Sequence, residues 1–131
     1  MSVVLKIDRR RKLVLSTFYG EVNGDELVRH GQEIQADPDF DPNFDEIVDF
    51  TAVTQPTVSE ETLAKLATGK SVFSLRVRHV IVAPADLPFE LAKKYQALTA
   101  ATRPKLLVVR TVAEAYQLLD IDSRDDLRQA G

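Results

Sequence analysis

The sequence predicts a single α/β domain built on one mixed sheet. Apolar runs alternate with segments of helical periodicity in the order β-β-α-β-α-β-α-β-α. The last three strands are continuous apolar runs separated by helices, which is typical of parallel strands covered on both faces. Only a short polar turn separates the first two strands, which favours an antiparallel hairpin. We therefore expect about five strands and about four helices.

The N-terminal hairpin is predicted from two alternating segments, residues 3–7 and 12–19, with a charged turn at residues 8–11. Residues 20–24 begin and end with glycine and are expected to break the second strand. The turn holds three consecutive arginines, which could contact phosphate. A solvated hairpin tip is the simpler interpretation, because no aromatic platform accompanies them.

The first helix is expected over residues 25–36, where apolar residues recur at helical spacing, and Pro38 prevents further helix. The loop that follows, residues 37–45, is rich in aspartate. It lacks the central glycine and the correctly spaced glutamate of an EF-hand, so we expect no metal there.

The third strand, residues 47–50, is followed by a hydroxyl-rich loop at residues 51–59 and then by a helix that begins near Ser59. Two caps compete for the start of this helix: Thr57, in a hydroxyl-x-x-acid box, and Ser59 itself. Gly69 is expected to end the helix.

An apolar strip at residues 72–77 either begins a long fourth strand or covers the core. The clearer strand is residues 79–83. Asp86 is expected to cap the third helix, with Pro88 in its first turn.

Residues 105–109 predict the fifth strand, and Thr111 opens a capping box for a last helix. The domain is therefore expected to span residues 1–119. Residues 120–131 are polar and predict a frayed tail.

The composition excludes several classes of function. The chain has 131 residues, a net charge of -3 and no cysteine. The charge gives no basic field for nucleic acid, and the missing cysteines exclude thiol chemistry, which fits a cytoplasmic protein. No apolar run approaches the ~20 residues that span a bilayer.

The element order, together with Val48-Asp49-Phe50-Thr51 and the capped helix that follows, resembles the STAS domain. It is most similar to the bacterial subgroup called SpoIIAA-like or STAS/SEC14, which shares the opening hairpin and a strand such as residues 79–83. The resemblance implies a non-catalytic regulatory or protein-interaction module, like the anti-sigma factor antagonists. Residues 55–59 lack the aspartate and the glycine of the phosphorylated turn in signalling STAS domains.

The loop after the third strand is the first candidate site, because ligands of open α/β sheets bind at the carboxyl ends of strands. A phosphate or another anion could sit at Thr54, Thr57 or Ser59; the alternative is that the hydroxyls only cap the helix. Asp49 is expected to brace this loop rather than to react.

An apolar pocket is the second candidate, and it would make the protein a carrier or sensor of a small lipid-like ligand. Its expected lining comes from the second and third helices: Leu63, Leu66, Phe89, Leu91, Tyr95 and Leu98. Periodicity alone also fits a filled core. The apolar strip could form a homodimer surface through Val72, Phe73, Leu75 and Val77, unless it is an ordinary buried strand.

Enzymatic motifs are missing from the sequence. It contains no Gly-x-Ser-x-Gly elbow, no P-loop, no dinucleotide fingerprint and no metal-ligand spacing around His30 or His79. We expect His30 to be a partly exposed helix residue and His79 to be a strand-end residue. The sequence therefore predicts no catalytic residues and no cofactor, with a protein partner, a second copy or a small apolar ligand as the binding partner.

Overall fold

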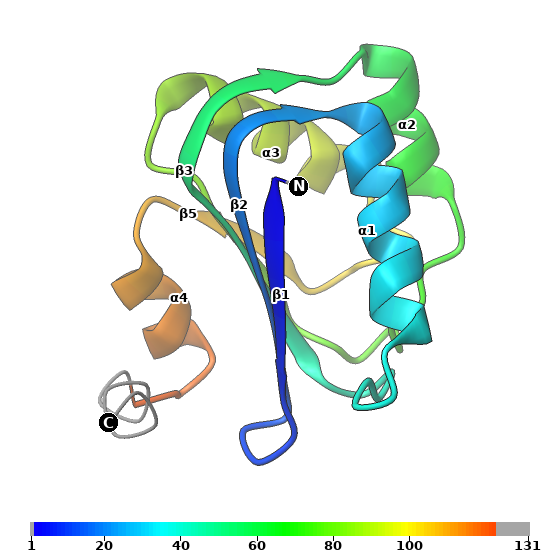
Figure 1. Ribbon diagram of the computed structural model, residues 1–131, viewed down its shortest axis with the longest axis vertical. Coiled ribbons are helices and arrows are strands. Elements are labelled where there is room, and N and C mark those ends of the chain that lie inside the picture. The colour runs from blue at the N-terminus through cyan, green and yellow to red at the C-terminus, as the bar shows by residue number, and fades with distance from the viewer. Residues whose placement is uncertain (1, 123–131) are drawn as a thin grey trace.

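A computed structural model describes residues 2–122 of the chain (Figure 1). Its strands are β1 (Val3–Asp8), β2 (Leu13–Asn23), β3 (Asp45–Thr57), β4 (His79–Val82) and β5 (Leu106–Val109). Its helices are α1 (Gly24–Ala36), α2 (Glu60–Thr68), α3 (Asp86–Leu98) and α4 (Val112–Leu118). No helix in this range is long and apolar enough to cross a membrane.

The five strands form one mixed sheet in the order β1-β2-β3-β4-β5. β1 pairs with β2 antiparallel, and every other neighbouring pair is parallel. The hairpin turn is fixed by Asp8, which accepts from the backbone N–H and the Nε–H of Arg11. The predicted fold class is therefore confirmed.

The sheet has helices on both faces, and the side chains of adjacent residues in a strand point to opposite faces. α4 covers one face, and its core cluster is Leu13, Ile47, Val80, Val82, Val109, Ala115, Tyr116 and Leu119. Val14, Val48 and Ile81, each next to a member of that cluster, belong to clusters on the other face. That second face lies under α1, α2 and α3 (Figure 1).

The predicted ends of β2 and β3 were wrong. β2 runs through the glycine segment to Asn23, and β3 runs through most of the predicted loop to Thr57. The two strands stay paired because register shifts near Phe18 and Gly20 absorb extra residues of β3. Gly20 has φ 68°, a conformation that suits glycine, so the glycine marks an irregularity inside a strand and not its end.

The apolar strip after α2 is neither a strand nor a continuous surface. It forms turns, and Phe73 and Val77 are buried in the cluster around Val14, whereas Leu75 is 60% exposed. Val72 packs against the same cluster. A strip with two buried members and one exposed member does not present the apolar face that a dimer surface at these residues requires.

The helix caps decide between the predicted alternatives. Ser59 caps α2 by accepting from the N–H of Thr62, and Thr57 instead ends β3. Asp86 does not cap α3, because it is the first helical residue and its carboxylate pairs with Arg110. Of the predicted tail, residues 123–131 lie outside the described residues.

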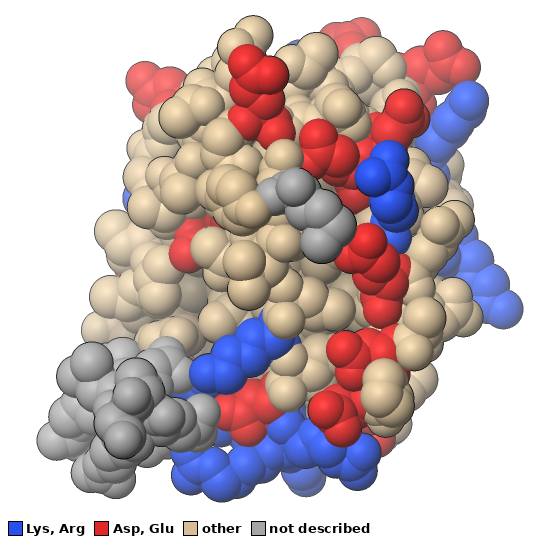
Figure 2. All heavy atoms as spheres, in the orientation of Figure 1, with Lys and Arg blue, Asp and Glu red and all other residues tan. Residues whose placement is uncertain are grey.

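Lys and Arg side chains gather, on the face drawn in Figure 2, at the end where the β1–β2 turn lies. Asp and Glu side chains lie among them, and both signs also occur together along the α1 side (Figure 2). The basic turn is thus a local feature of one end of the molecule.

The first residue of α1 makes a close contact that holds two helices together. A Cβ on Gly24 would lie 2.5 Å from Thr62 Cγ2 in the first turn of α2. We predict that Gly24→Ala lowers the free energy of unfolding by about 1–3 kcal/mol, because this contact leaves no room for a methyl group.

Gly31, in the middle of α1, is the matched control, because a Cβ there meets no atom within 4 Å. Gly31→Ala should raise the unfolding free energy by up to about 1 kcal/mol through helix propensity. Urea denaturation measures both variants. Equal effects of the two alanines would contradict the close-contact explanation.

Candidate functional site: a cavity between the helices and the sheet

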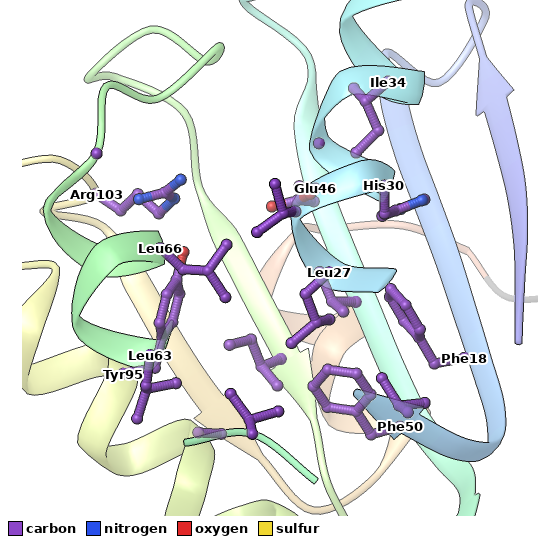
Figure 3. A pocket seen from close by; sticks show the side chains of 18 of the residues that line it. Phe18, Leu27, His30, Ile34, Glu46, Phe50, Leu63, Leu66, Tyr95 and Arg103 are labelled. Carbon is purple, nitrogen blue, oxygen red and sulfur yellow. The ribbon is translucent and has the colours of Figure 1, made fainter. Parts of the chain in front are cut away.

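A cavity of about 610 Å³ lies between the sheet and the three helices α1, α2 and α3 (Figure 3). Its floor consists of side chains from β2, β3, β4 and β5, and its walls come from α1 on one side and from α2 and α3 on the other. This volume falls in the range of small-molecule sites, about 300–1,000 Å³.

Apolar side chains make up most of the lining. Phe18 and Phe50 form the floor at one end, with ring centroids 5.3 Å apart. Leu27 projects from α1, and Leu63 and Leu66 project from α2 on the opposite wall (Figure 3). Such a surface favours an apolar occupant, because water gains few hydrogen bonds there.

The predicted pocket residues divide into two groups. Leu63, Leu66, Leu91 and Tyr95 line the cavity. Phe89 lies outside the lining and packs under the guanidinium of Arg110, 3.7 Å from its ring centroid. Leu98 is also outside the lining and is 45% exposed. The cavity further includes Val72 and Phe73 of the apolar strip.

Glu46, which lines the cavity, forms a polar pair with His79, which lies outside the lining. They lie opposite each other in the β3–β4 register, and Glu46 Oε1 is 2.8 Å from His79 Nδ1. An ionised carboxylate can only accept, so the pairing places a proton on Nδ1. His79 is 2% exposed, and its ring meets the edge of Phe73. Glu46 was not predicted, because the register between distant strands is not visible in the sequence.

His30 is buried, which corrects the prediction of a partly exposed residue. It is 6% exposed, and its Nε2 lies 2.6 Å from the hydroxyl of Ser16. Burial lowers the pKa of His30 below its ordinary value, and the nearby carboxylates of Glu46 and Glu33 offset only part of this effect. His30 is therefore neutral at pH 7.

Ser16, His30 and Glu33 are the residue types of a catalytic triad: a nucleophile, a base and an acid. Their geometry does not support catalysis. Ser16 has no exposed surface and does not line the cavity, so no substrate carbonyl could reach its hydroxyl. His30 Nδ1 is 3.8 Å from Glu33 Oε2, too long for a hydrogen bond. The hydrogen bond between His30 and Ser16 instead connects α1 to β2.

Tyr95 and Arg103 supply the polar groups on the wall opposite His30 (Figure 3). The Arg103 guanidinium lies 5.5 Å from the centroid of the Tyr95 ring. Burial raises the pKa of Tyr95 to about 12, so its phenol stays protonated at neutral pH. Arg103 was also not predicted, because the loop after α3 carries no sequence signal for a site.

The hydroxyls of the predicted anion loop do not converge. Thr54 and Thr57 are exposed residues of β3, whereas Ser59 accepts from the N–H of Thr62 and donates to its hydroxyl. Asp49 accepts from the backbone N–H of Thr51 at 2.8 Å and from its hydroxyl at 2.5 Å. These bonds lie at the irregularity inside β3.

The chain matches no protein-family model and no curated protein. The resemblance to STAS domains, and the bacterial SpoIIAA-like subgroup in particular, therefore stays a prediction. Within residues 2–122, no group of three or more histidine, aspartate or glutamate side chains is arranged to hold a metal ion.

Asp49 is predicted to stabilise the irregular part of β3. Asp49→Ala should lower the unfolding free energy by about 1 kcal/mol, because the Thr51 N–H loses its acceptor. Asp49→Asn keeps an acceptor oxygen and should lose less than half as much. Chemical denaturation of both variants measures the difference, and an alanine variant as stable as the wild type would refute the bracing role.

The buried neutral state of His30 predicts a specific pH dependence. Its pKa in the folded state lies below the ordinary value of 6.5, so the unfolded chain binds the proton more readily. Stability should therefore fall as the pH drops from 6.5 through the lowered pKa.

His30→Gln keeps a hydrogen-bonding group near Ser16 but removes the titration. Urea unfolding across this pH range should show a shallower decline for the variant than for the wild type. Parallel curves for the two proteins would show that His30 does not cause the effect.

Proposed function

We propose that the protein binds a small apolar, lipid-like ligand in the cavity, as a carrier or sensor. The observation that carries this proposal is the cavity itself, with a volume of about 610 Å³ and a predominantly apolar lining. Protein interiors are normally packed as densely as organic crystals, so an apolar space of this size in a 131-residue chain favours an occupant.

The arrangement of the helices also supports a ligand site over a filled core. α1 and α2 are held together at Gly24 and Thr62, near the start of each helix. Between their remaining turns the lining residues Leu27 and Leu66 face the same cavity from opposite walls (Figure 3). A ligand in this space would bury apolar surface from both helices and from the sheet.

The regulatory role implied by the STAS resemblance stays a prediction. The Ser59 hydroxyl already caps α2, and Glu60 and Glu61 place negative charge in the same turn. Phosphorylation there would replace a formed cap and add charge beside two carboxylates. A ligand-sensing role is compatible with a protein partner, because occupancy of the cavity can change the surface of α1 and α2.

Straight-chain alkanols test the proposed function without a charged head group. We predict saturable binding in which each added methylene tightens the dissociation constant about fourfold, as expected for about 0.8 kcal/mol per buried CH₂. Isothermal titration calorimetry with octanol, decanol and dodecanol measures the series. An increase in melting temperature should accompany binding.

Leu66→Trp places a larger side chain in the cavity and should weaken dodecanol binding on the order of tenfold or more. Leu98→Trp is the control, because Leu98 is exposed and outside the lining. The proposal fails if no alkanol binds, or if the two tryptophan variants weaken binding equally.

A further inference from the structure

We infer that the ligand is an anionic amphiphile whose carboxylate is bound by Arg103 and by the hydroxyl of Tyr95. This inference rests on the proposed function, because it assigns the head group of the ligand in the same cavity. Three observations support it: Arg103 lacks an ion-pair partner among residues 2–122, cationic side chains outnumber carboxylates in the lining, and the polar side chains gather toward one end of the cavity (Figure 3).

Arg103 has unused hydrogen-bonding capacity at the cavity. Its side chain is half-buried, and its Nη1 donates to the Thr102 hydroxyl at 3.2 Å. No carboxylate among residues 2–122 forms an ion pair with it. A guanidinium carries five N–H donors in a planar fork that matches a carboxylate, so most of its donors remain for a ligand.

Tyr95 lies beside the guanidinium and adds a neutral donor. The Arg103 carbon Cζ lies 5.5 Å from the centroid of the Tyr95 ring, and the Tyr95 oxygen points toward the Arg103 side of the cavity (Figure 3). The phenol is protonated at neutral pH, and its hydroxyl has no hydrogen-bond partner among the described residues. A carboxylate at this point would accept from both side chains.

The charges of the lining favour an anion. Lys65, Lys70 and Arg103 line the cavity, against the single carboxylate of Glu46. Lys65 is paired with Glu61 on the surface of α2, 3.2 Å away. Glu46 already accepts from His79, so the charged side chains of the lining without an ion pair among residues 2–122 are Arg103 and Lys70. Lys70 is exposed, whereas Arg103 is half-buried.

The labelled charged side chains and His30 gather toward one end of the cavity, where the apolar Ile34 also lies (Figure 3). Arg103, Glu46 and His30 lie toward one end, whereas Leu63, Phe18 and Phe50 lie toward the other (Figure 3). An amphiphile can therefore place its head at Arg103 and its chain over the phenylalanine floor. The chain would remain in the part of the lining with no charged side chain.

The experiment compares dodecanoate, dodecanol and dodecylamine, which share one chain and differ in the head group. At about pH 8 the carboxylate is fully ionised, because carboxyl groups titrate near pH 4. Calorimetry should show that dodecanoate binds about tenfold tighter than dodecanol, as expected for hydrogen bonds to a charged group. Dodecylamine should bind more weakly than dodecanol.

Arg103→Gln should abolish the preference for dodecanoate and leave dodecanol affinity within about twofold. Tyr95→Phe should weaken dodecanoate binding by about fivefold and spare dodecanol. Arg29→Gln is the matched control, because Arg29 is exposed on α1 and does not line the cavity. If the glutamine variant does not fold, the preference for dodecanoate over dodecanol is measured in Arg103→Lys instead.

The outcomes separate the two proposals. Equal affinity for the three amphiphiles overturns the head-group assignment and leaves the apolar-ligand function in place. Tightest binding of dodecylamine, lost in Glu46→Gln, overturns it in favour of a cationic head group. Binding of none of the three refutes the proposed function itself.

Discussion

The parallel pairing of β2 with β3 is the constraint on which the rest of the structure depends. Both strands continue past the ends of their other neighbours and remain paired through two irregularities of register. β2 leads directly into α1 at Asn23, and β3 reaches α2 after Thr57. The two helices therefore begin side by side, in contact at Gly24 and Thr62, and enclose the cavity over the sheet (Figure 1).

The polar groups of the cavity are each held by a different part of the fold. Register places Glu46 against His79, and the packing of α1 on β2 places His30 against Ser16. Both contacts use hydrogen-bonding capacity inside the protein. Arg103, in the loop before β5, has most of its donors left. The chemical character of the site thus follows from which polar groups the scaffold already satisfies.

Local patterns predicted the fold class well and the strand ends poorly. The continuous apolar run at β4 indicated a strand covered on both faces, and all four of its residues are buried. Gly20 indicated the end of β2, although it lies at an irregularity within that strand. The hydroxyl-rich segment after Phe50 indicated a loop, but pairing with β2 keeps it extended to Thr57. Propensity acts over a few residues, whereas strand pairing is a tertiary interaction that overrides it.

The sequence by itself determined the element order, the mixed sheet and the candidate leucines of α2, because these depend on periodicity within single segments. Only the tertiary structure decided that Glu46, His30 and Arg103 share one cavity with Tyr95. These residues are far apart in the chain, and their meeting depends on strand register and on the spacing of α1 from α2. The same helical spacing fits a filled core or an open cavity, and packing between elements alone distinguishes the two.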